Sequence, residues 1–138
     1  MAGKRLSKED FLLSLDLAPR MVVELVIKDS EGRIFLIERE SEPFVGYWHL
    51  PGGFLMKGEK IQECVERLLG DECGMIVGGV RSEFLGVFEN LEGDNRGHIL
   101  HYVVKVDVDG VRGGKFFELL PGKMVHHQRD FLGGLGIK

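Results

Sequence analysis

One stretch decides the fold of this 138-residue chain: GFLMKGEKIQECVERLLGDECGM, which runs from Gly53 to Met75. Its second part, from Glu59 to Cys73, has apolar residues at helical spacing, and Gly74 stands where a C-terminal cap belongs. We therefore expect one helix here, preceded by a turn that contains two adjacent glycines.

The apolar stripe of this predicted helix ends in a carboxylate. At about 100° per residue, one face carries three apolar residues and an acidic one: Ile61, Val65, Leu68 and Glu72. A buried carboxylate without a partner is unfavourable, so Glu72 would have to be paired or bound to a metal, with Asp71 close by. The alternative is that the stripe simply ends and Glu72 is exposed in the last turn.

The turn before the helix offers backbone oxygens. Gly52 and Gly53 follow a predicted short strand, and glycines there let the backbone approach a ligand closely. A carbonyl from this turn, together with helix carboxylates, is an all-oxygen set that suits Mg²⁺ or Mn²⁺. In a chain of net charge −4, such a metal would supply the local positive charge that a diphosphate needs.

Further elements follow from periodicity and turn residues. A short helix is expected from Lys8 to Leu17, and the region after Gly133 looks loose. The turn Asp29–Gly32 predicts a hairpin between the first two strands. The predicted strands are Met21–Lys28, Arg33–Arg39, Tyr47–Leu50, Glu83–Phe88, Ile99–Val108 and Phe116–Leu120. Strands with helices spaced among them predict an α/β sandwich around a mixed sheet.

Composition limits the function classes. Eighteen basic and 22 acidic side chains argue against binding to nucleic acid or an acidic membrane through bulk charge. No apolar run approaches the ~18 residues of a membrane span. Cys64 and Cys73 would lie roughly 13 Å apart on one helix, too far for a disulfide, which favours two reduced thiols in a cytoplasmic protein. The length fits one domain, residues 1–138.

The decisive stretch resembles the Nudix box, G-x5-E-x7-R-E-U-x-E-E-x-G-U, where U is a bulky apolar residue. The matching positions are Gly53, Glu59, Arg67, Leu69, Asp71, Glu72, Gly74 and Met75, with Asp71 in place of a glutamate. The resemblance implies a Nudix-type α/β/α sandwich around a mixed β-sheet, a divalent cation, and a substrate that is a nucleoside diphosphate linked to another group.

One departure from the box points to a branch. Leu68 stands where the box has its first glutamate, as in the GDP-mannose mannosyl hydrolases, and the likeness extends over about Leu6 to Val106. That branch implies attack of water at C1 of the sugar of a nucleotide sugar such as GDP-mannose, with a nucleoside diphosphate as leaving group. A homodimer is expected as well.

The resemblance implies a site, residue by residue. The Mg²⁺ ligands would be the Gly52 carbonyl, Glu72, Asp71 and His126, with Mn²⁺ as a possible substitute. His127 would be the general base, although the assignment among His126, His127 and Gln128 stays open. Arg39 and Arg67 would neutralise the diphosphate. The remaining implied positions are Tyr102 as a hydrogen-bond donor to the leaving group, Glu24 on the first strand, and Phe11 against the nucleotide, within one chain or across the dimer.

Two further departures leave alternatives open. Phe54 replaces an arginine that contacts the diphosphate in that branch, and the tail, residues 109–138, lacks the expected tryptophan and following helix. A pyrophosphohydrolase that cleaves P–O–P, with Glu59, Asp71 and Glu72 as metal carboxylates, is the first alternative. A non-catalytic nucleotide-binding module is the second.

Overall fold

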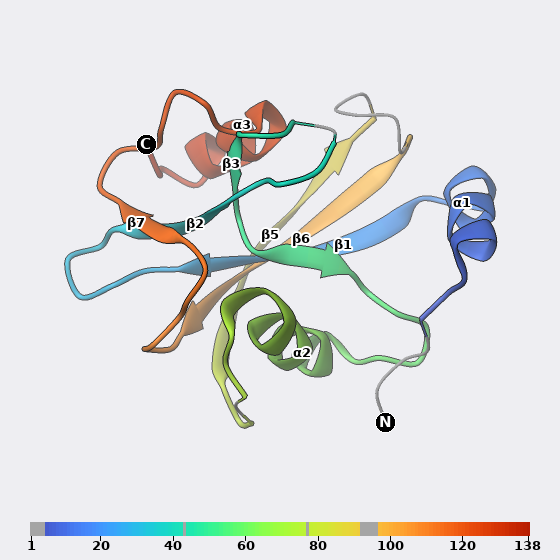
Figure 1. Cartoon of the computed structure of the whole chain (residues 1–138), viewed down its shortest axis with the longest axis horizontal. Helices are drawn as coiled ribbons and strands as arrows, with labels where there is room; N and C mark the ends of the chain where they lie inside the picture. Colours follow the sequence, from blue (N-terminus) through green and yellow to red (C-terminus); the bar gives the residue numbers. More distant parts are fainter. Residues whose placement is uncertain (1–4, 43, 77, 92–96) are drawn as a thin grey trace.

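Two sheets and three helices form the protein, in a computed structural model that describes residues 5–42, 44–76, 78–91 and 97–138 (Figure 1). The elements in chain order are α1 (Lys8–Leu17), β1 (Arg20–Ile27), β2 (Ile34–Glu38), β3 (Trp48–His49), β4 (Gly52–Phe54), α2 (Ile61–Cys73), β5 (Arg81–Asn90), β6 (Ile99–Asp107), β7 (Lys115–Phe117) and α3 (His126–Gly134). The larger sheet has the order β4-β1-β6-β5, and the smaller one β3-β2-β7.

The larger sheet is mixed and is centred on β1. This strand pairs parallel with β6 and antiparallel with β4, and its residues 22–27 are all buried. A near-continuous apolar strand is typical of a position that is covered on both faces. The strand predicted at Met21–Lys28 is therefore present as β1, and it lies inside the sheet rather than at its edge.

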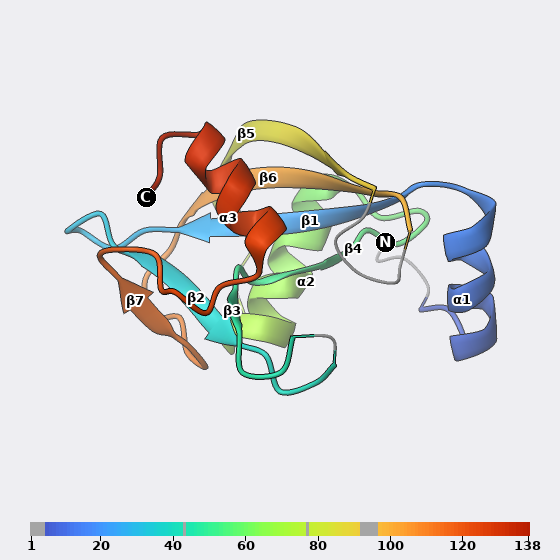
Figure 2. The same ribbon diagram turned by 90° about the horizontal axis from the view of Figure 1, so that it is seen from above.

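Helices cover both faces of this sheet. One set of alternating β1 residues, including Val23 and Leu25, packs with Val65 and Leu69 of α2. The other set, including Val26, belongs to the cluster that contains Phe131 and Leu132 of α3. Figure 2 shows α3 crossing one face of the sheet while α2 lies beyond the other. The α/β/α sandwich predicted from the sequence is confirmed.

The predicted hairpin between the first two strands is wrong. The turn forms, with Asp29 Oδ1 accepting hydrogen bonds from the backbone of Glu31 and Arg33. Beyond it, however, only the isolated bridge Lys28–Ile34 links the two strands. Both edges of β1 are already hydrogen-bonded to β4 and β6, so β2 diverges and becomes the centre of the smaller sheet.

The expectation that the tail has no helix and ends loosely is also wrong. Residues 126–134 form α3, although the segment contains glycines and has no side-chain N-cap. Phe131 and Leu132 are buried against the sheet, so tertiary packing supplies what local helix propensity does not. The helix begins at His126, the first residue of the histidine pair.

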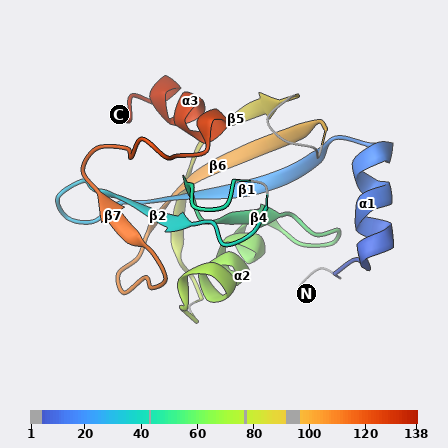
Figure 3. The same cartoon turned by 45° about the horizontal axis from the view of Figure 1, so that its top comes forward.

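Helix α1 lies at one end of the sheet, apart from α2 and α3 (Figure 3). Its N-cap is Ser7, as its sequence predicts, and the Ser7 side chain accepts a hydrogen bond from the Asp10 amide at 3.1 Å. None of its residues is buried. Across the described part of the chain, no helix has the length and apolar character needed to cross a membrane.

Candidate active site

Two residues of the box motif fix the turn from β4 into α2. The Arg67 guanidinium donates to Glu59 Oε2 at 2.7 Å and to the Phe54 carbonyl at 3.0 Å. Glu59, whose side chain is fully buried, also accepts from the Met56 amide. Burial raises the pKa of Glu59, but the hydrogen bonds from Arg67 and Met56 outweigh it, so the pKa is lowered overall. Glu59 therefore serves as an anchor of the turn rather than as a free carboxylate.

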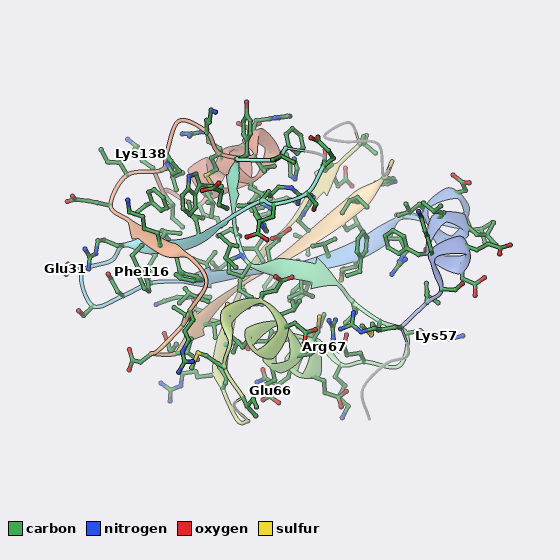
Figure 4. The ribbon with its side chains drawn as sticks, in the orientation of Figure 1. Glu31, Lys57, Glu66, Arg67, Phe116 and Lys138 are labelled. Carbon is green, nitrogen blue, oxygen red and sulfur yellow. The ribbon has the colours of Figure 1, made fainter. Side chains whose placement is uncertain are left out.

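Arg67 is largely committed to this anchor. Figure 4 shows it on the side of α2 that faces the segment carrying Lys57, whereas Glu66 points away from the sheet. Its Nη1 lies 3.6 Å from Asp71 Oδ2 and its side chain is 18% exposed. The guanidinium thus borders the site, where the sequence placed it, but its strongest contacts are structural.

Leu68 fills the position where the box motif has its first glutamate. Its side chain is buried, and a Cβ added to Gly53 would come within 2.8 Å of Leu68 Cδ2. Leu68 therefore packs directly against the backbone of β4 at Gly53, where any residue with a side chain would collide with it. Leu68 thus adds to the hydrophobic core at a position where the box motif has a carboxylate.

Glu72 is where the core stripe of α2 ends. Val65 and Leu68 are buried, but Glu72 in the last turn is exposed, as in the alternative stated for the stripe. The protein around its carboxylate removes part of the water, and together with the charges of Asp71 and Glu24 this raises the pKa of Glu72, against the opposite effects of Arg67 and Arg39. The ionised form of Glu72 is thus disfavoured, by loss of water first and by the neighbouring carboxylates next.

Glu24 supplies the neighbouring carboxylate from β1. It is 3% exposed and lies opposite Gly52 in the β1–β4 ladder. A Cβ added to Gly52 would come within 2.5 Å of Glu24 Oε2. The His101 Nδ1 lies 3.1 Å from Glu24 Oε1, which ties this carboxylate to β6. Gly52, Glu24 and Glu72 thus come from three elements to one region of the molecule.

These oxygens suit a divalent cation in part. Among the residues that the structure describes, no group of three or more His, Cys, Asp or Glu side chains is arranged to hold a metal. The raised pKa of Glu72, caused in part by two other carboxylates, is nevertheless what a bound cation relieves. A metal here would have to combine these carboxylates with the Gly52 carbonyl and water.

Two cavities meet at Glu72. The α1 cavity, of about 850 Å³, has among its lining residues Phe11, Arg20, Phe54, Arg67, Asp71 and Glu72. The Arg39 cavity, of about 760 Å³, has among its lining residues Arg39, Trp48, His49, Glu72, Gly114 and Lys115. Both cavities carry cationic side chains, so each is chemically suited to a phosphate group.

Phe54 does not leave the α1 cavity without an arginine. The Arg20 guanidinium lies 4.8 Å from the centre of the Phe54 ring and 5.7 Å from that of Phe11. The two rings meet edge to face at 5.0 Å. Phe11 therefore contacts the site of its own chain, and a cation from β1 occupies the neighbourhood of the arginine that the sequence lacks.

The two histidines at the start of α3 contact other aromatic rings. The His126 ring contacts Phe44, with ring centres 5.8 Å apart, and His127 lies 5.1 Å from the His101 ring. Gln128, the next residue of this run, contacts the Glu24 carboxylate. Its Nε2 lies 3.5 Å from both oxygens of Glu24, and its Oε1 accepts from the Leu50 amide at 2.7 Å.

Tyr102 lies on the other face of the larger sheet. It packs with the cluster under α2, its ring centre 4.9 Å from that of Phe84, whereas Glu24 and His101 face α3. Strand alternation explains the separation, because neighbouring residues of β6 point to opposite faces. The structure thus does not bring Tyr102 together with Glu24 and His101.

The sequence alone assigns no site role to His49 or His101. His101 alternates with Ile99 and Val103, which are buried on the same face, and a histidine in such a row needs a polar partner. That alternation was a usable signal. For His49, which lines the Arg39 cavity, no local pattern distinguishes it from a surface residue.

His49 should stay neutral over the ordinary pH range. Burial, and next the charge of Arg39, lower its pKa to about 4. Because this pKa is below that of the unfolded chain, the stability it reflects is present above pH ~6.5 and is lost as pH falls toward 4. In an NMR titration, the His49 ring signal is identified by its absence from the spectrum of His49→Asn. Its chemical shift should stay constant between pH 8 and pH 5.5. A midpoint near 6.5 would contradict this expectation.

Gly52→Ala should displace the Glu24 carboxylate. The added methyl group would overlap Glu24 Oε2 and approach the Val23 carbonyl at 2.8 Å. Overpacking of this kind costs about 1–3 kcal/mol, so urea denaturation should show a lower free energy of unfolding. Hydrolysis should fall as well. Gly122→Ala is the control, since nothing lies within 4 Å of its Cβ; equal stability of the two variants would contradict the close contact.

The comparisons with known proteins agree on the family. Residues 18–119 match the NUDIX domain. This chain belongs to the Nudix hydrolase family. It is 34% identical over 143 residues to the ADP-ribose pyrophosphatase of Methanocaldococcus jannaschii, a match that covers 92% of this chain and 83% of that protein. Nudix hydrolases generally use divalent metals such as Mg²⁺ or Mn²⁺ and act on small nucleotide substrates.

Two other proteins are similar to this Nudix hydrolase in sequence or in structure. The low-salt glycan biosynthesis protein Agl8 of Haloferax volcanii is 35% identical over 97 residues, covering 66% of this chain and 60% of that one. The crystal structure of a MutT Nudix hydrolase from Burkholderia pseudomallei superposes with a TM-score of 0.70 at 27% identity, covering 84% and 97% of the two chains. None of the three bears the name of a GDP-mannose hydrolase.

Proposed function

We propose that this Nudix hydrolase cleaves the P–O–P link of a nucleoside diphosphate derivative such as ADP-ribose, with Mg²⁺ or Mn²⁺. The observation that carries the proposal is the position of Glu72. It borders two cavities that both contain arginines, and loss of water together with the charges of Asp71 and Glu24 raises the pKa of its carboxyl group. The similarity to an ADP-ribose pyrophosphatase over nearly the whole chain supports the same reaction.

The metal would be held by oxygen atoms. Glu72 and the Gly52 carbonyl are the first candidates, with Asp71 and Glu24 beside them. A divalent cation here would neutralise the diphosphate and stabilise the charge that develops on its oxygens during hydrolysis. Gln128 from α3 and His101 from the adjacent strand β6 position Glu24, because both contact its carboxylate.

The diphosphate would lie across Glu72, between cations. Arg39 and Lys115 line the cavity on one side of Glu72, and Arg20 lines the cavity on the other. These side chains stand near the charge that a leaving phosphate develops, which is where preorganised cations favour the transition state. Arg67 contributes less directly, since Glu59 and Phe54 hold its guanidinium.

Substitution at the sugar C1 of a GDP-mannose-like substrate is the second candidate. It is favoured by Leu68, which leaves α2 with fewer metal carboxylates, and by a glutamine in contact with Glu24. In this reaction His127 would be the base and Tyr102 a donor to the leaving group, with His126 as a further metal ligand. Against it, the ring contacts of His126 lie with Phe44 and His127, and Tyr102 faces α2.

Assembly and location belong to the same proposal. Exposed leucines on α1, among them Leu12, Leu13 and Leu17, offer a surface for a homodimer. A reducing, cytoplasmic setting fits Cys64 and Cys73, which are both buried and free. Sedimentation analysis of the intact chain, with Leu13→Glu as the variant, tests the dimer; a monomer at all concentrations would exclude it.

Product chromatography tests the reaction. The protein is incubated with ADP-ribose and, separately, GDP-mannose, with Mg²⁺ or with EDTA. Formation of AMP and ribose 5-phosphate, only with the metal, is the expected result. Release of GDP and free mannose would establish the second candidate instead. If neither substrate, nor other nucleoside diphosphate derivatives, were cleaved, the protein would be a nucleotide-binding module.

A further inference from the structure

A third cavity lies between α3 and the ends of β5 and β6, on the same face of the larger sheet as Glu24. This α3 cavity has a volume of about 630 Å³, and its lining residues include Phe88, Asn90, His101, His126, His127 and Phe131. Figure 2 shows α3 crossing these strands. The reaction proposed above leaves this cavity without a role.

Two buried nitrogen atoms of its lining lack partners. His101 is 1% exposed and Asn90 is 9% exposed. Neither His101 Nε2 nor Asn90 Nδ2 has a hydrogen-bond partner among the described residues. Buried polar groups are rarely left unsatisfied, because the loss of water is then uncompensated. A ligand in the cavity would supply both missing hydrogen bonds.

The two nitrogens differ in hydrogen-bond character. The His101 Nδ1 lies 3.1 Å from Glu24 Oε1, and a carboxylate accepts hydrogen bonds, so the ring proton is assigned to Nδ1. In that tautomer Nε2 is an acceptor. Asn90 Nδ2 is a donor. The cavity therefore pairs one acceptor with one donor, which complements a group that presents a donor beside an acceptor.

The walls and the charge narrow the ligand further. Phe88 stacks on Phe131 with ring centres 5.1 Å apart, and Phe131 lies 5.4 Å from the His101 ring. Flat rings of this kind favour a planar ligand. The charged residues of the lining are Glu89 and Asp130, and no lysine or arginine is among them. The cavity is thus unlike the two that border Glu72, and it is unsuited to phosphate.

We infer that the α3 cavity binds the nucleobase of the substrate, and that it selects a base with an amino group beside a ring nitrogen, as adenine has. The amino group donates to His101 Nε2 while Asn90 Nδ2 donates to the ring nitrogen. This inference rests on the proposed function for the link to catalysis, since Glu24 contacts His101 on one side and approaches Gly52 on the other.

Binding of AMP and IMP, measured by calorimetry in EDTA, tests the inference without any hydrolysis. At the same edge IMP presents an acceptor oxygen and a donor ring N–H. Its oxygen would face the acceptor His101 Nε2, and its N–H would face the donor Asn90 Nδ2, so neither hydrogen bond would form. AMP should bind at least tenfold more tightly than IMP, which corresponds to about 1.4 kcal/mol. Asn90→Leu should weaken AMP binding about tenfold, whereas Glu83→Gln, an exposed change on the same strand, should not.

Equal binding of AMP and IMP by the unaltered protein would overturn the inference, even if Asn90→Leu failed to fold. NMR shifts locate the bound base as well: AMP should perturb Phe88, His101 and Phe131, and perturbation confined to Phe11 and Phe54 would place the base in the α1 cavity instead. If ADP-ribose is not cleaved but the preference for AMP over IMP depends on Asn90, the result would contradict the proposed reaction and support the nucleobase pocket. Cleavage of ADP-ribose with no base preference would support the reaction and overturn the nucleobase pocket.

Discussion

Glu72→Gln is expected to reduce metal-dependent hydrolysis of ADP-ribose at least 100-fold. The substitution removes one negative charge where two cavities meet, and the amide is a much poorer ligand for Mg²⁺ than a carboxylate. Removal of residues that merely support metal ligands already costs 10- to 100-fold in metal affinity or activity, so a direct ligand should exceed that range. The measurement is kcat with saturating Mg²⁺.

The same substitution should stabilise the protein when no metal is present. The pKa of Glu72 is raised by partial burial and by Asp71 and Glu24, so the ionised form is disfavoured in the folded state. The free energy of unfolding of the unaltered protein then falls as pH rises from the unfolded pKa through the folded pKa. At pH 7 in EDTA, Glu72→Gln should have the higher Tm, and this advantage should vanish at pH values below the unfolded pKa.

A matched control separates the site from general loss of charge. Glu83→Gln removes an exposed carboxylate of β5 that lines none of the three described cavities, and it should leave kcat unchanged. Mg²⁺ should raise the Tm of the unaltered protein and of this control, and much less that of Glu72→Gln. A Glu72→Gln enzyme with full activity would refute the metal assignment.

Arg67→Met is expected to lower the free energy of unfolding by about 3–5 kcal/mol, because it leaves the Glu59 carboxylate buried without its partner. Glu59 has a fully buried side chain, and no described lysine or arginine other than Arg67 is hydrogen-bonded to it. Urea denaturation at pH 7 is the measurement. The double variant Glu59→Met, Arg67→Met should recover much of the loss, since neither charge then remains buried.

The pH dependence of this effect has a definite sign. Because the pKa of Glu59 is lowered in the folded state, the stability it provides is present above the unfolded pKa, ~4.3, and is lost as pH falls through the folded value. The gap between Arg67→Met and the unaltered protein should therefore narrow below pH 4. Arg33→Met breaks the exposed pair with Asp29 and should change stability far less. Equal effects of the two variants would contradict the buried-pair assignment.

The fold was predictable where a local pattern sets the structure. The α2 periodicity, the Gly74 cap and the apolar β1 run each specify one element by themselves, and each is present. The partner of β2 was not predictable from its turn, because the partners of β1 come from residues far along the chain. Helix α3 depends on the burial of Phe131 and Leu132, which no local signal reveals.

Some residues of the candidate site could likewise be predicted from the sequence, and others could not. Gly52, Arg67, Asp71 and Glu72 belong to one continuous motif, so their proximity could be read from the sequence. The contacts of Glu24 with His101 and Gln128 join residues 77 and 104 positions apart, and only the folded sheet brings them together. Tyr102 and His101 are adjacent in sequence yet face opposite sides, a separation that strand alternation predicts once β6 is known.

Hydrolysis of ADP-ribose in ¹⁸O-water with Mg²⁺, followed by mass spectrometry of the products, tests the proposed reaction most directly. Attack at phosphorus places the label in AMP or ribose 5-phosphate, as a phosphate oxygen, and none in a free sugar. That result is expected for the unaltered protein and should disappear with Glu72→Gln. With GDP-mannose as the substrate, whose diphosphate is attached to the sugar C1, label in free mannose together with unlabelled GDP would contradict cleavage of the P–O–P link.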